Sequence, residues 1–198
     1  MPSHLNFPDT FYSSHKTDHQ MESIKFRIFA VLLFCACLGI TNTTYAQASD
    51  NATLNVVLAD VRSIKLNPAQ STVQLNFKTA SDYQNGVVEN QNAHLEVMST
   101  GGFQVKVRSS GLSLVNGINT IPVSTISLVP SLSSGYVDMG ASFQTVTLSP
   151  TQQQMISTPN GTTKIVFDVR YMASGGQPYI DKKAGTYVTT ITFCIEPS

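Results

Sequence analysis

Alternation of apolar and polar residues with a period of two runs through most of this chain and constrains its fold more than any other feature. It is clearest over residues 103–109, where Phe103, Val105 and Val107 alternate with polar neighbours. Strict alternation is typical of β-strands with one buried and one solvated face. The same pattern recurs over residues 53–61, 72–78, 93–99, 120–129, 142–149, 163–172 and 187–196.

The segments between these runs contain the residues that favour turns. Asn85-Gly86, Asn116-Gly117 and Asn160-Gly161 are pairs suited to tight hairpins. Only residues 149–157 have a helix-like start, with Pro150 at the first position. The pattern predicts an all-β protein, an immunoglobulin-like antiparallel β-sandwich of about 7–9 strands, with a barrel as the alternative.

A secretory leader is expected before the sandwich. Lys25 and Arg27 precede an apolar run over residues 28–40, and small residues follow it. This is the order of a signal peptide, and we expect cleavage between Ala46 and Gln47. The apolar run is shorter than a comfortable membrane span.

The predicted organisation is therefore a leader over residues 1–46 and one β-sandwich domain over residues 47–198. The signal peptide itself is placed at residues 21–46. The residues before it are polar and without periodicity, so both Met1 and Met21 remain candidate starts.

Charge and cysteine usage limit the classes of partner. The chain has 12 basic and 12 acidic residues, and this balance argues against a nucleic-acid partner, which needs a basic face. No membrane span is expected in the mature chain. Of the cysteines, only Cys194 follows the cleavage site, so we expect it to be a packing residue or an unpaired thiol.

The sequence offers little catalytic chemistry. After the leader the single histidine is His94, and alternation places it on the outward face of its strand, where it should be dispensable. An enzyme site needs several titratable groups brought together, so we expect no enzyme and no cofactor or metal. A small secreted hydrolase is the least favoured reading. Residues 81–94 are rich in Asn, Gln and Asp, which keeps glycan binding as an alternative.

The two ends of the predicted sandwich resemble those of several bacterial surface proteins. "AGTYVTTITFCIEP" closes the chain and "NATLNVVLADVRSIKL" follows the leader. Both are similar to strands of spore-coat-protein-U-like subunits, colonisation-factor alpha-type fimbrial subunits and WxL-type surface domains. Phe193 stands where the WxL pattern has tryptophan, so anchoring to a cell wall in that manner is not implied.

The resemblance implies an incomplete sandwich whose groove accepts a strand from the next subunit. The donor would be residues 51–60, with Leu54, Val56 and Leu58 entering the groove. The groove floor would comprise Tyr187, Ile191, Phe193 and Ile195. The alternative is that residues 51–60 are the first strand of their own domain.

The function expected on this basis is that of a secreted structural or adhesive protein, a pilin-like subunit of a fimbrium, at the bacterial cell surface after passage through the periplasm. Its expected partners are further copies of itself or other surface subunits, and a periplasmic chaperone. The alternative function is that of a monomeric carbohydrate-binding or adhesin module.

Overall fold

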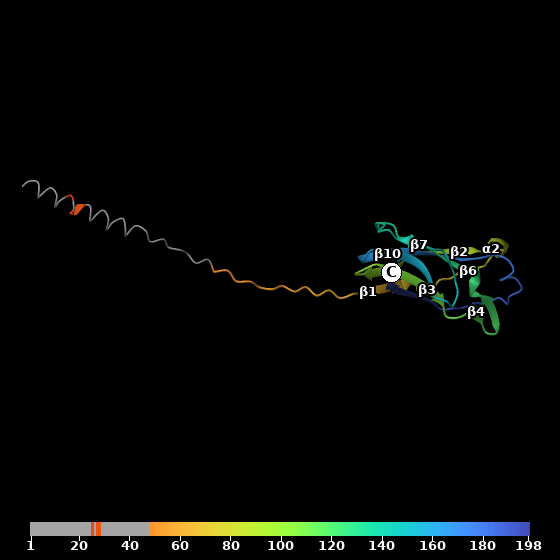
Figure 1. Cartoon of the computed structure of the whole chain (residues 1–198). Helices are drawn as coiled ribbons and strands as arrows, with labels where there is room; N and C mark the ends of the chain where they lie inside the picture. Colours follow the sequence, from red (N-terminus) through yellow and green to blue (C-terminus); the bar gives the residue numbers. More distant parts are fainter. Residues whose placement is uncertain (1–24, 26, 29–47) are drawn as a thin grey trace, which may run out of the picture. The chain divides into compact units, whose positions relative to one another are not determined.

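The computed structural model describes residues 25, 27, 28 and 48–198 (Figure 1). Lys25, Arg27 and Ile28 are helical. The predicted cleavage site at Ala46 and Gln47 lies outside the described residues. The strands all belong to the compact unit Val56–Ser198. Within the described parts of the chain, no helix has the length and apolar character needed to cross a membrane.

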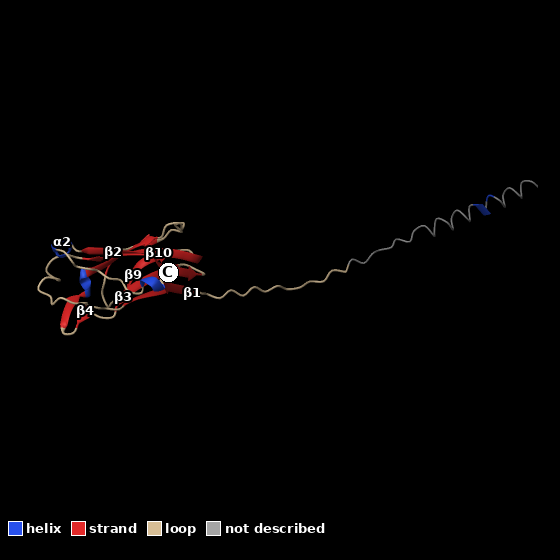
Figure 2. Cartoon of the chain, turned by 180° about the vertical axis from the view of Figure 1, so that it is seen from behind, coloured by secondary structure: helices blue, strands red, loops and turns tan. Residues whose placement is uncertain are grey.

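Two antiparallel sheets form the domain (Figure 2). The first has the strand order β1 (Arg62–Leu66), β2 (Val87–Ser99), β10 (Thr162–Ala173), β6 (Ile126–Leu132) and β8 (Val146–Thr147). The second has the order β11 (Ile191–Pro197), β3 (Phe103–Ser109), β9 (Gln153–Thr158) and β7 (Ser142–Phe143). A separate hairpin joins β4 (Ser113–Asn116) to β5 (Asn119–Pro122). The predicted all-β sandwich is confirmed.

The core lies between the two sheets and follows the alternation seen in the sequence. Phe103, Val105 and Val107 of β3 are fully buried, whereas Arg108, on the opposite face of the same strand, is exposed. The first sheet contributes Leu95, Val97, Leu128, Ile165, Phe167 and Val169 to the same cluster. Burial of these side chains, at about 25 cal/mol per Å² of apolar surface, is the main force that holds the sheets together.

Three local predictions are wrong. Residues 149–157 do not form a helix; β9 occupies Gln153–Thr158 and pairs with β3 and β7. Met155 and Ile156 are both buried there, and this burial outweighs the helix-like start at Pro150. Residues 72–78 and 53–61 were expected to be strands, but residues 73–78 and 53–61 carry no strand assignment.

The pair Asn85-Gly86 was expected to form a tight hairpin turn and instead ends a short helix, α2 (Ala80–Asn85). The Thr79 hydroxyl accepts a hydrogen bond from the backbone N–H of Asp82, and the Asp82 carboxylate accepts one from the N–H of Thr79. This reciprocal capping box satisfies two free N–H groups at the helix start. Two short 3₁₀ turns, η1 (Pro68–Gln70) and η2 (Val123–Thr125), complete the elements.

Candidate functional site

The segment before β1 presents an apolar side with no partner among the described residues. Residues 51–60 are extended and carry no strand assignment. Leu54, Val56 and Leu58 are 87%, 74% and 88% exposed. The first strand of the sandwich is β1, which begins at Arg62. We call residues 51–60 the extension.

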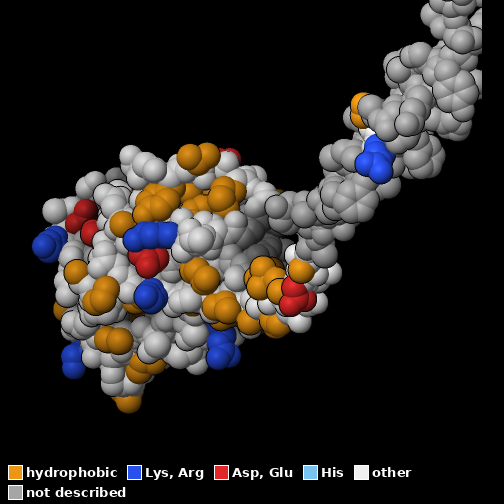
Figure 3. Space-filling view, turned by 90° about the vertical axis from the view of Figure 1, so that its left-hand side faces the viewer, with side chains coloured by type: hydrophobic (Ala, Val, Ile, Leu, Met, Phe, Trp, Pro, Cys, Tyr) orange, Lys and Arg blue, Asp and Glu red, His pale blue; other side chains and the backbone are white. Residues whose placement is uncertain are grey.

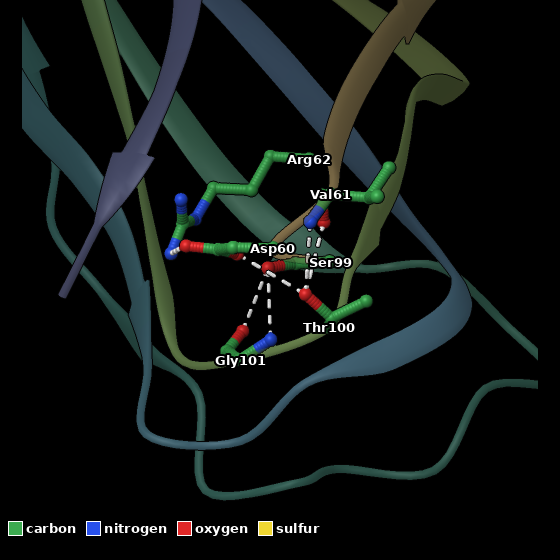
Figure 4. Close-up of polar contacts among 6 residues, drawn as sticks. All are labelled: Asp60, Val61, Arg62, Ser99, Thr100 and Gly101. Atoms are coloured by element: carbon green, nitrogen blue, oxygen red, sulfur yellow. Dashed lines mark hydrogen bonds and ion pairs between the residues drawn. The ribbon is translucent and has the colours of Figure 1, made fainter. Parts of the chain in front are cut away.

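A polar network fixes the point where the extension joins the domain (Figure 4). The Val61 N–H donates to Thr100 Oγ1 (3.0 Å), and the Thr100 N–H donates to the Val61 carbonyl (3.0 Å). Thr100 Oγ1 also donates to Asp60 Oδ1 (3.1 Å), while Asp60 Oδ2 lies 2.8 Å from Arg62 Nη2. We call Asp60, Val61, Arg62 and Thr100 the root.

Sequence reasoning missed the root because its partners lie 40 positions apart. Ser99 stabilises the turn that carries Thr100, since its hydroxyl donates to the Gly101 carbonyl at 2.7 Å. The only signal in the sequence was the turn-forming run Ser99–Gly102, and it gives no indication of the partner.

β11 is an edge strand with a half-buried apolar row. It pairs with β3 on one side, and within the described chain no strand pairs with its other side. Ile191, Phe193 and Ile195 pack against the core but remain partly exposed. β1 is the edge of the other sheet on the same side, and the two strands lie close together. We call this side of the sandwich the open edge.

Tyr187, the fourth residue predicted for the groove floor, is not part of β11. Its hydroxyl donates to the Lys183 carbonyl (2.8 Å) in the preceding loop. The structure therefore brings together three of the four predicted floor residues on one strand.

A second stretch of backbone, residues 73–77, makes no hydrogen bond within the described chain. Its alternate side chains Val73, Leu75 and Phe77 nevertheless pack against the core. A hollow of about 320 Å³ is lined by residues 74–76, by Asp82 and by residues 86–89. The Asp82 carboxylate is already engaged by two backbone N–H groups of the helix cap, which also hold its pKa below the usual range.

His94 was predicted to face solvent, and this prediction is wrong, because the side chain is 1% exposed. The β10 partners Phe167 and Val169 are two residues apart, but they pair with Leu95 and Gln91, which are four apart. Residues 92–94 therefore bulge opposite Asp168, whose carboxylate accepts from the Ala93 N–H at 2.6 Å. Ala93 takes a positive φ of 51°, and this bulge breaks the simple alternation.

Two hydrogen bonds fix the tautomer of His94. Gln70 Nε2 donates to the Asn92 carbonyl (2.8 Å), so Gln70 Oε1 faces His94 Nδ1, also at 2.8 Å. Nδ1 must then carry the proton, and Nε2 accepts from the Tyr171 hydroxyl (2.8 Å). The ring also makes an edge contact with Phe193 of β11, with centroids 5.9 Å apart.

Burial lowers the pKa of His94 to about 4. An unfolded chain has a histidine pKa near 6.5, so between pH 6.5 and 4 the unfolded state binds the extra proton. Stability should therefore fall as pH falls through this window, by up to about 3 kcal/mol in total. Urea unfolding at pH 7 and pH 4.5 measures this loss.

The matched variant for this pH dependence is His94→Gln, which lacks the titrating group. Its loss of stability between the two pH values should be clearly smaller than that of the parent chain. Equal losses in the two proteins would contradict the assignment. The comparison subtracts the contributions of Glu96 and Glu196, whose pKa values are lowered by Lys164 and Lys106.

Cys194 is free. Its Sγ lies 2.8 Å from Gln152 Nε2, and burial is the main cause that raises its thiol pKa. Among the described residues, no group of three His, Cys, Asp or Glu side chains is placed to hold a metal ion. On the face drawn in Figure 3, basic and acidic side chains lie scattered among apolar ones.

Comparisons with known proteins find similarity among solved structures. No protein-family model matches the chain, and no curated protein matches it. A chain from the solved structure of a chaperone–usher pilus is similar, with a TM-score of 0.40 and 14% identity; the match covers 78% of this chain and 99% of that one. A likeness at this level carries no information about function.

Proposed function

We propose that this chain is a secreted structural or adhesive surface protein, a fimbrial-type subunit that assembles by strand addition. The observation that carries the proposal is the extension, whose apolar residues Leu54, Val56 and Leu58 are exposed in their own chain. An alternating apolar segment that stays unpaired in its own domain is suited to a partner's sheet edge.

The open edge supplies matching chemistry. The outer side of β11 presents backbone N–H and C=O groups that no strand of the described chain satisfies. A strand added there would pair with these groups and bury its alternate side chains against Ile191, Phe193 and Ile195. Strand addition would therefore bury the apolar side chains of the extension and pair the free backbone groups of β11 at the same time.

Secretion and chaperone binding are parts of the same proposal. The predicted signal peptide supports export to the periplasm and then to the bacterial cell surface. An exposed sheet edge also invites aggregation, so a periplasmic chaperone that covers the open edge before assembly is a natural partner. A structural role without catalysis fits these features.

A monomeric glycan-binding module is the second candidate, and the hollow beside residues 74–76 and 86–89 favours it. Gln74, Asn76 and Glu89 are among the residues that line this hollow, and their side chains carry donors and acceptors of the kind that bind sugar hydroxyls.

The two candidates differ in the oligomers that they form. We express the full chain with its own leader, extract it in mild detergent, and run samples on a gel with and without boiling. A ladder of regularly spaced bands that collapses to one band on boiling is the expected result. A single band under both conditions, together with glycan binding by the purified monomer, would contradict assembly and favour the module.

A further inference from the structure

The β4–β5 hairpin carries exposed apolar residues that the fold does not use. Ile118 at its tip is 97% exposed, and Val115 on β4 is 47% exposed. Val188 of the segment leading into β11 is 61% exposed and exchanges two backbone hydrogen bonds with Val115, at 2.9 and 3.0 Å. We call Val115, Ile118 and Val188 the hairpin patch.

The inward-facing positions of the hairpin are occupied by other residues. Ile121 is buried and Leu114 packs against the core. Gly117 supplies the positive φ (59°) that the two-residue turn requires. Turn positions usually carry polar residues, so an isoleucine at the tip contributes nothing to folding that a polar residue would not.

The hairpin patch and the root lie at opposite ends of the domain. Figures 1 and 2 both place β4 at the end of the sandwich away from the start of β1. The root end also holds the end of β11, because Ser198 donates its N–H to the Gly102 carbonyl (3.3 Å) next to the root turn. β11 therefore runs from the hairpin patch toward the root.

The direction of an added strand decides what kind of assembly forms. A donor that runs parallel to β11 would place the two root ends together, and reciprocal exchange would close a dimer. If the donor runs antiparallel to β11, the C-terminal end of its extension would emerge at the hairpin end of the acceptor. The root of the donor would then face the hairpin patch of the acceptor, and the contact would repeat without closure.

For a donor that runs antiparallel to β11, the short link between the extension and β1 would bring the root of the donor against the hairpin patch of the acceptor. Only Ala59–Val61 separate Leu58, the last apolar residue of the extension, from Arg62 in β1. Three extended residues span about 10 Å. If Leu58 of the donor packs beside the start of β11, the donor's own domain must lie close to the hairpin patch of the acceptor.

We propose that the hairpin patch is a second contact between successive copies of this chain and seats the root of the next copy. This inference rests on the proposed strand addition and names the surface that orients each subunit on its neighbour. Val61, which is 44% exposed beside the root network, is the apolar side chain that the hairpin patch receives.

Photo-crosslinking of the full chain tests the contact directly. Benzoylphenylalanine in place of Ile118 should give a crosslinked dimer within the boiling-sensitive ladder, with the adduct on peptides that contain residues 59–62 or 99–101. Adducts within the same chain, elsewhere on a neighbour, or on a different protein would overturn the inference. A parent chain that forms no ladder would overturn the proposed function as well.

A pair of substitutions tests the energetic contribution of the patch. Ile118→Asp should leave the unfolding temperature of the monomer fraction unchanged, because the side chain is exposed, but should shorten the lifetime of the ladder in mild detergent about tenfold. Ile118→Leu keeps an apolar tip and should retain the parent lifetime. Equal lifetimes for the two variants would overturn the contact.

Discussion

Replacing Leu54, Val56 and Leu58 together by threonine should abolish the boiling-sensitive ladder. Threonine keeps the preference for extended structure but removes much of the apolar area that the open edge would bury. Each such side chain contributes about 1.5–3 kcal/mol when buried. Ordering the strand already costs conformational entropy, so we expect the remaining binding free energy to be too small to hold the subunits together. The measurement is the fraction of extracted chain that runs above the monomer without boiling.

The opposite side of the extension provides the matched control. Replacing Asn55, Val57 and Ala59 by threonine changes as many residues, including the 92% exposed Val57, but leaves the donor side intact, so the ladder should persist. The unfolding temperature of the monomer should be the same in both variants. A marked drop in that temperature for the first variant alone would show that the extension stabilises its own domain and would contradict donation.

His94→Ala should destabilise the isolated domain by about 2–4 kcal/mol. The change leaves a cavity next to Tyr171 and Phe193, whose rings contact the imidazole at centroid distances of 5.6 and 5.9 Å. It also leaves Gln70 Oε1 and the Tyr171 hydroxyl without their partner. Urea unfolding at pH 7, where the imidazole is neutral in the folded state and mostly neutral in the unfolded chain, measures the loss.

Tyr171→Phe isolates the hydrogen-bond part of this effect. It removes one hydroxyl and keeps the ring, so it should cost about 1 kcal/mol. A value below about 0.5 kcal/mol for His94→Ala, which is typical of surface positions, would contradict the buried placement of the imidazole.

The period-two pattern predicted the sheets well because alternation reports which side chains face the core. It did not predict His94, because a bulge of residues 92–94 opposite the single residue Asp168 changes the facing of the strand. The residue with positive φ is Ala93, which has none of the glycine or asparagine character that would mark such a bulge in sequence.

Alternation also does not predict whether a segment forms backbone hydrogen bonds with a neighbouring strand. Residues 73–77 alternate and pack their apolar side chains inward, whereas residues 54–58 alternate with their side chains exposed. Neither stretch pairs with a neighbouring strand of the described chain by backbone hydrogen bonds. Backbone pairing depends on which strands become neighbours in the folded sheet, and the local sequence of a strand does not specify its neighbour. The root and the hairpin patch escaped prediction for the same reason, since both join segments that are distant along the chain.

The root has a mechanical consequence. If copies of this chain assemble through the extension as proposed, tension along the assembly would enter each domain through Val61 and pass directly to β1. The five residues of β1 pair antiparallel with β2, from Arg62 opposite Ser99 to Leu66 opposite Leu95. Because β1 runs away from the loaded end, the pull acts along the strand and strains these pairs simultaneously in shear. The Thr100 bonds at the root keep the first pair from peeling open, so the domain would hold its shape under load.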